Sequence, residues 1–130
     1  MESEPRHLFV YGTLRPGEVR WPILEPFVVG EGHDDAVAGS LFDTGAGYPA
    51  ALFGGEHRIH GRTYELVGDT IGRCLELLDD VEGGVDGLYH RVAVRSLGGT
   101  DVWAYQYGGG LTLTRIESGD WVQREGPQRA

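Results

Sequence analysis

The hydrophobic positions of this chain fall mostly in short runs and alternations that are typical of β-strands. Residues 8–11 form a short apolar run that predicts a first strand. Residues 57–66 alternate, so Ile59 to Glu65 at odd positions share one face and His60 to Leu66 at even positions share the other. The same criteria predict strands within 36–45, 48–53, 89–97 and 101–107, and 111–121 closes the domain.

Turn-forming residues separate these runs. Gly98-Gly99-Thr100 predicts a hairpin turn between the two strands that flank it. Asp43-Thr44-Gly45 ends the strand that precedes it. Proline lacks an N–H for the hydrogen-bond ladder of a sheet. We therefore expect Pro49 to lie either in an edge strand or at the start of a strand. The segment 20–29 is ambiguous, and we expect a short helical turn followed by a strand near 27–30.

One segment has clear helical spacing. Asp69 or Thr70 can cap its start, and we expect the helix to end near Asp80, before a pair of glycines. Its apolar residues recur at a helical period. These residues are Ile71, Cys74, Leu75, Leu77 and Leu78.

The order of these elements indicates the fold class. About six strands and one good helix follow one another mostly as hairpins, which favours an α+β domain with a largely antiparallel, curved sheet that could close into a small barrel. A doubly wound sheet would need helices between most strands. We expect a polar N-terminal tail over 1–6, a single domain over 7–122 and a polar C-terminal tail over 123–130.

The composition of the chain limits which binding partners and which cellular location we expect for the protein. The chain has 130 residues, 20 acidic and 11 basic side chains, and a net charge of −9. This field repels nucleic acid and anionic membranes, although a local loop could still bind a small anion. No apolar run approaches the roughly 20 residues of a membrane span, and the start lacks the apolar core of a signal peptide. With Cys74 as its single cysteine, we expect a cytoplasmic protein; the sequence does not indicate its oligomeric state.

Metal and cofactor motifs are weak. His57 and His60 are three apart, but strand alternation places them on opposite faces, and there is no cysteine cluster. The glycine-rich stretch "YGTLRPG" lacks the spacing of a dinucleotide or P-loop motif. The serine-hydrolase pattern G-x-S-x-G is absent. We therefore expect neither a metal nor a cofactor.

One carboxylate has a suggestive position. Glu82 follows the apolar helix and precedes a double glycine, which could place it at the rim of the core. Burial there would raise its pKa and make it a usable general acid or base. The alternative interpretation is a surface acid at a helix C-terminus, where the helix dipole mildly disfavours an anion.

The loop after the first strand is the second candidate. Glycine at position 12 lets a ligand approach the main chain closely. Consecutive N–H groups that turn away from a strand form a small anion-binding concavity, suited to a carboxylate or a developing oxyanion. A plain tight turn that leaves through Pro16-Gly17 is the alternative interpretation.

Several segments match one family in its own order, and the chain resembles the γ-glutamylcyclotransferase-like proteins, including those described as AIG2-like. The resemblance covers residues 8–121. The matching segments are "FVYGTLRPG", "GYPAAL", "IHGRTYEL", "LDDVEGG" followed by "LYHR", "WAYQY" and "IESGDW".

The resemblance implies a fold and a set of site residues. The family fold is a small mixed barrel with peripheral helices. The family's catalytic glutamate corresponds to Glu82, and its substrate-holding loop to Tyr11, Gly12, Thr13 and Leu14. Substrate-side tyrosines correspond to Tyr89 and, less securely, to Tyr105, because Tyr107 lies on the same strand face. Arg91 matches a family arginine whose role could be structural.

The implied activity is cleavage of a γ-glutamyl amide by its own α-amine, which gives 5-oxoproline and a free amine or amino acid. The implied partner is a small γ-glutamyl compound. The segment after Glu82 departs from the family pattern, because Gly83, Gly84 and Gly87 stand where family members often have an aromatic residue and a longer proline-bearing loop. Substrate size and identity therefore stay open. The alternatives are a non-catalytic binding or regulatory domain that retains the pocket, and a structural or interaction protein.

Overall fold

The computed structural model describes residues 5–12, 18, 21–45, 49–83, 89–107 and 114–121, with only the backbone course for 81–83. Six strands form one sheet in the order β4-β5-β1-β3-β2-β6. The strands are β1 (His7–Val10), β2 (Val28–Asp43), β3 (Pro49–Leu66), β4 (Tyr89–Arg95), β5 (Asp101–Tyr107) and β6 (Thr114–Arg115). The helices are α1 (Trp21–Leu24) and α2 (Ile71–Gly83), with 3-10 turns η1 (Glu25–Phe27) and η2 (Gly68–Thr70).

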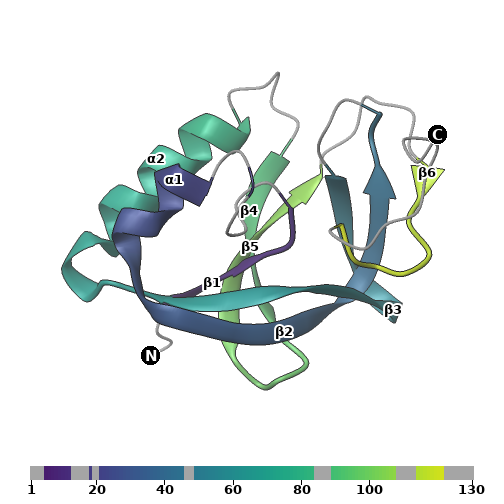
Figure 1. The fold of residues 1–130 in the computed structure, drawn as a ribbon, viewed down its shortest axis with the longest axis horizontal. Coiled ribbons are helices and arrows are strands. Elements are labelled where there is room, and N and C mark those ends of the chain that lie inside the picture. The colour runs from purple at the N-terminus through teal and green to yellow at the C-terminus, as the bar shows by residue number, and fades with distance from the viewer. Residues whose placement is uncertain are drawn as a thin grey trace.

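The sheet is mixed and curls into a half-barrel, with α1 and α2 together on one side of it (Figure 1). β1 pairs with β5 in parallel, while the other paired strands are antiparallel. The predicted α+β fold, with a mixed and mainly antiparallel curved sheet, one main helix and short helical turns, is confirmed.

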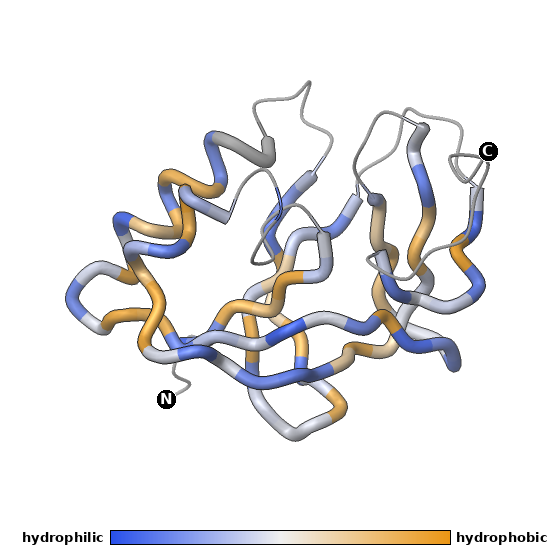
Figure 2. Tube along the Cα trace, viewed as in Figure 1, coloured by the Kyte–Doolittle hydropathy of each residue, from blue (hydrophilic) through white to orange (hydrophobic). Residues whose placement is uncertain are grey.

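β1 occupies the centre of the sheet, between β5 and β3, which explains its uninterrupted apolar sequence. Leu8, Phe9 and Val10 are all buried because both faces of the strand are covered. Leu8 and Val10 belong to the core cluster beneath α2, whereas Phe9 and Tyr11 belong to a second cluster. Figure 2 shows the hydrophobic stretches of α2 facing the sheet.

The two longest strands each join segments that the sequence pattern predicted as separate strands. β2 shifts register between Val29 and His33, where two glycines have positive φ, and again between Ala38 and Gly39. At the second shift β3 carries extra residues, including two further glycines of positive φ. Bulges of this kind bend strands and increase their twist, which accounts for the curl of the sheet. The prediction that Pro49 starts a strand is confirmed.

α2 extends three residues beyond the predicted end at Asp80 and finishes at Gly83. Glu82 therefore has its backbone in the last helical turn instead of in a loop. The predicted apolar stripe is correct except for Leu77, which is exposed because it lies off the i, i+3, i+4, i+7 face. The buried helix residues are Cys74, Leu75 and Leu78.

Two local elements, a hairpin turn and a short helical turn, match the sequence predictions. The hairpin between β4 and β5 is confirmed, and Gly99 has positive φ in its turn. The helical turn at 21–27 followed by a strand is also confirmed. Among the described residues, no helix has the length and apolar character that crossing a membrane requires.

Candidate functional site

The C-terminal end of α2, the start of β4 and the end of β5 lie at the same edge of the molecule (Figure 1). Hydrogen bonds at this edge join α2 to the strands. The Nε and Nη2 groups of Arg91 on β4 donate to the two carboxylate oxygens of Asp79, at 3.0 and 3.1 Å. The Tyr105 hydroxyl on β5 donates to Asp79 Oδ1 at 2.7 Å. Asp79 therefore anchors α2 one turn before Glu82.

The anchor is a charged network. The guanidinium carbon of Arg91 lies 4.2 Å from the centre of the Trp103 ring, so the cation is stacked as well as paired. Partial burial raises the pKa of Asp79, but the hydrogen bonds from Arg91 and Tyr105 and the Arg91 charge outweigh burial, so the pKa is lowered overall. Asp79 is thus held as a carboxylate that accepts from three donors.

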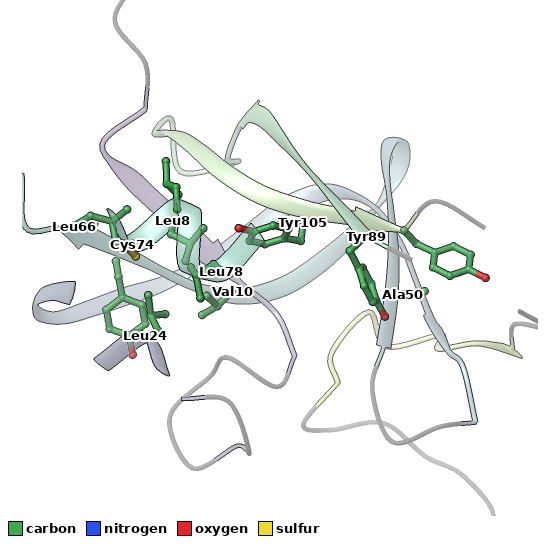
Figure 3. Close-up of a cluster of buried hydrophobic side chains, with 12 residues drawn as sticks. Leu8, Val10, Leu24, Ala50, Leu66, Cys74, Leu78, Tyr89 and Tyr105 are labelled. Carbon is green, nitrogen blue, oxygen red and sulfur yellow. The ribbon is translucent and has the colours of Figure 1, made fainter. Parts of the chain in front are cut away.

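Three tyrosine side chains tie the ends of the strands together. The Tyr11 hydroxyl, just after β1, donates to the main-chain oxygen of Tyr105 in a buried hydrogen bond. The Tyr89 hydroxyl donates to the main-chain oxygen of Pro49 at the start of β3. The ring centres of Tyr89 and Tyr107 are 6.1 Å apart in an edge-on arrangement. Figure 3 shows Tyr105 beside the core leucines and Tyr89 beside Ala50.

Gly12 is buried against the proline that Tyr89 contacts. A Cβ at Gly12 would lie 2.5 Å from Pro49 Cγ and 2.8 Å from Cδ. Glycine is needed here because no side chain would leave room for the Pro49 ring. Pro49 thereby links the end of β1 to the start of β4.

The structure brings together Tyr11, Gly12, Tyr89 and Tyr105, four of the residues predicted for the site. Thr13 and Leu14 lie outside the described residues, as do the loop 84–88 and the predicted tail 123–130. The sequence motifs did not indicate a role for Asp79. Its position three residues before Glu82 could have indicated a role, because residues three apart share one helix face.

The two histidines hold different places on β3. His57 is among the residues 54–57 that have no partner on β2, whereas His60 pairs with Ala36, and both line one cavity. Across the part of the chain that the structure describes, no three His, Cys, Asp or Glu side chains gather as metal ligands.

Comparison with known proteins identifies the family. The family model "Gamma-glutamyl cyclotransferase, AIG2-like" matches residues 8–123, and the chain belongs to this family. A relative from Niallia circulans, named gamma-L-glutamyl-butirosin B gamma-glutamyl cyclotransferase, is 36% identical over 122 residues, which are 90% of this chain and 76% of that protein. The family and this named relative support an enzyme of the gamma-glutamylcyclotransferase kind.

Solved structures share the fold of this chain. The solution structure of ytfP from Escherichia coli is 30% identical and has a TM-score of 0.63, covering 90% of this chain and 96% of that one. An AIG2-like protein from Mus musculus has a TM-score of 0.61 and covers 98% of this chain and 94% of that one. The mouse protein is 20% identical, so it shows the shared fold alone.

Proposed function

We propose that the protein cleaves a γ-glutamyl amide by attack of the substrate's α-amine on its own γ-carbonyl, releasing 5-oxoproline and a free amine or amino acid. Family membership supports the reaction class. The observation that carries the proposal is the anchoring of α2, because Asp79 is bound by Tyr105 and Arg91 one helical turn before Glu82. The proposed catalytic residue thus belongs to a helical turn fixed to the end of β5.

In the proposed mechanism Glu82 takes a proton from the α-ammonium group, and the neutral amine attacks the γ-carbonyl carbon. A C–N bond forms and closes the five-membered ring. Glu82 returns its proton to the amide nitrogen as the original C–N bond breaks, and the released amine takes up the second proton of the ring nitrogen and leaves as an ammonium group. No water is consumed. Positioned proton transfer of this kind contributes about 10²–10⁴-fold in rate.

The loop that begins at Gly12 is the proposed binding site for the oxyanion or the substrate carboxylate. Backbone N–H groups of Gly12, Thr13 and Leu14 are the candidate donors. Losing one oxyanion donor typically raises the activation free energy by about 3–4 kcal/mol. The contact between Gly12 and Pro49 fixes where this loop leaves β1, which supports a preorganised start of the loop.

The hydrogen bonds that the tyrosine hydroxyls already make determine whether they can donate to a substrate or only accept from it. A phenol has one proton, and Tyr89 and Tyr105 already donate theirs to Pro49 and Asp79. Toward any further partner, their oxygens can only accept. Acceptors of this kind suit the N–H groups of a substrate ammonium, which is the role we propose for both tyrosines.

The leaving amine is the least constrained part of the proposal. The relative from Niallia circulans is named for gamma-L-glutamyl-butirosin B. This chain carries a net charge of −9. Such a field attracts cations. We therefore propose that leaving groups with additional positive charge are preferred to anionic ones, and expect added salt to weaken that preference.

The test is release of 5-oxoproline from a panel of γ-glutamyl amino acids, γ-glutamyl amines and a γ-glutamyl polyamine. Glu82→Gln should abolish turnover, whereas Glu76→Gln, the same change on an exposed part of the same helix, should retain it. Cyclisation predicts 5-oxoproline without ¹⁸O from labelled water. Glutamate carrying ¹⁸O would instead indicate hydrolysis and contradict the mechanism.

A second candidate function is a binding or regulatory domain that retains the pocket. It predicts a ligand-induced rise in melting temperature with no 5-oxoproline from any panel member. Turnover that Glu82→Gln removes would exclude it. A cytoplasmic location and a small-molecule partner without nucleic acid are part of the same proposal.

A further inference from the structure

A second site lies on the long strands, away from the tyrosine cluster. It is a cavity of about 200 Å³ between β2, β3 and the turn after β6. Its walls come from residues 39–41, from His57, Arg58 and His60, and from residues 115–119. None of the residues assigned to the proposed active site lines it.

Main-chain hydrogen bonds hold the walls of this cavity in place. The N–H of Ile116 donates to Leu41 O at 2.8 Å, and the N–H of His60 donates to Gly119 O at 2.7 Å. The turn is therefore fixed to β2 at one end and to β3 at the other. Gly119 has positive φ and sits so close to the main-chain oxygen of Arg58 that a side chain would clash with it. The cavity is thus preformed by backbone geometry.

The cavity gathers basic side chains in an acidic protein. Two arginines and two histidines line it, Arg58, Arg115, His57 and His60. Among the described residues, Glu117 is the one carboxylate in its wall. Arg115 and Glu117 are 3.9 Å apart, and the Glu117 side chain is 85% exposed, so this pair is weak. Within the described part of the chain, no hydrogen bond or ion pair engages the side chain of Arg58 or of either histidine. Two of the 11 arginines in the chain, Arg58 and Arg115, therefore line this cavity without a strong ion pair to a carboxylate.

We propose that this cavity binds a small oxyanion, with phosphate or a phosphate monoester as the favoured ligand. Guanidinium groups present paired N–H donors that match oxyanion geometry, and Arg58 and Arg115 come from different strands. Imidazole N–H groups add further donors. The long-range field of the chain repels anions, so binding would depend on these local donors.

The test is a titration of the ¹⁵N-labelled full chain with inorganic phosphate, followed by amide chemical shifts. Sodium chloride at matched ionic strength is the control for general salt effects, and acetate is a parallel carboxylate arm. We expect saturable shifts at 39–41, 57–60 and 115–119 with phosphate and not with chloride. Saturation by acetate at similar affinity would support the oxyanion site and assign it to carboxylates. Equal, non-saturating shifts with all three salts would overturn the proposal.

Variants locate the binding groups. Arg58→Gln should weaken phosphate binding about tenfold, since it removes charge-assisted hydrogen bonds. Arg95→Gln is the matched control, because Arg95 is an exposed strand residue paired with Asp101 elsewhere on the sheet. If Arg58→Gln does not fold, Arg115→Gln gives the same test. Unchanged affinity in a folded Arg58 or Arg115 variant would overturn the proposal. This readout does not depend on turnover, so it stands apart from the proposed cyclisation.

Discussion

The hydroxyl of Tyr105 donates to Asp79 Oδ1 at 2.7 Å, which joins β5 to the last part of α2. Arg91 binds both oxygens of the same carboxylate from β4. Glu82 follows Asp79 by three residues, so a shift of this helical turn would move the proposed catalytic residue. Asp79 is therefore a positioning residue in the proposed mechanism.

Asp79→Asn should lower kcat/KM about tenfold, mainly through kcat, because the change weakens charge-assisted bonds that hold the turn. It should also shift the acidic limb of the pH–rate profile to lower pH. The variant removes a neighbouring anion and releases the Arg91 charge, and both effects favour ionised Glu82. Steady-state 5-oxoproline kinetics across pH measure both changes.

The matched control is Asp80→Asn, which alters an exposed acid on the same helix. We expect its kcat and pH profile to stay close to those of the wild type. Tyr105→Phe removes one hydrogen bond while keeping the Arg91 pair, and should lower the free energy of unfolding by about 1 kcal/mol. An unchanged pH profile in Asp79→Asn would contradict the positioning role.

Asp35 should make the fold sensitive to acid. Its side chain is almost fully buried, and burial raises its pKa, but hydrogen bonds from Ser96, Thr63 and the N–H groups of Ala36 and Gly98 lower it overall. A carboxyl with a lowered folded pKa contributes its full stability above its unfolded pKa, near 3.8. That contribution is lost as the pH falls through the folded value. Urea unfolding at a series of pH values measures the effect.

Asp35→Asn should therefore reduce the fall in unfolding free energy below about pH 4. It should not remove it, because the pKa of Asp79 is also lowered in the folded state. Asp34→Asn is the control, since the Asp34 side chain is 89% exposed and its pair with Arg62 should matter little. Equal acid sensitivity in wild type and Asp35→Asn would refute the assignment.

Cys74 should be unreactive in the folded protein. The thiol is fully buried on α2, and burial raises its pKa to about 11, so almost no thiolate exists at neutral pH. We expect iodoacetamide to label Cys74 only after unfolding by denaturant. Rapid labelling under native conditions would show that α2 opens from the sheet.

The sequence predicted correctly those features of the fold that depend on residues close together in the chain. The apolar run of β1, the Gly98-Gly99 turn and the face of α2 that carries Cys74 and Leu78 each depend on spacing within a few residues. The two long strands were predicted in pieces, because positive-φ glycines interrupt their alternation without ending them. The end of α2 was misjudged because a pair of glycines usually marks a helix end.

The site itself depends on contacts between distant parts of the chain. The Tyr11 hydroxyl reaches a residue 94 positions away, Tyr89 reaches one 40 positions away and Tyr105 one 26 positions away. Spacing along the sequence carries no information on such pairs. The resemblance to a family supplied Tyr89 and Tyr105 as site residues, but their partners Pro49 and Asp79 required the fold.

Gly12 and Gly72 offer a matched pair of substitutions with opposite expected signs. Alanine at Gly12 would place its methyl group against Pro49, so either β1 or the start of β3 must move. We expect a loss of about 1–3 kcal/mol in the free energy of unfolding, as for overpacking elsewhere. On the proposed function kcat should also fall, because the loop with the oxyanion donors starts at this residue.

Gly72 lies in the first turn of α2, and a Cβ there would meet nothing within 4 Å. Gly72→Ala should raise the free energy of unfolding by about 0.4–1 kcal/mol, because alanine restricts the unfolded chain and favours the helix. Urea unfolding and 5-oxoproline release measured on both variants separate the two effects. If Gly12→Ala kept wild-type stability and turnover, the close contact with Pro49 would not be what fixes the loop, and the role proposed for Gly12 would fail.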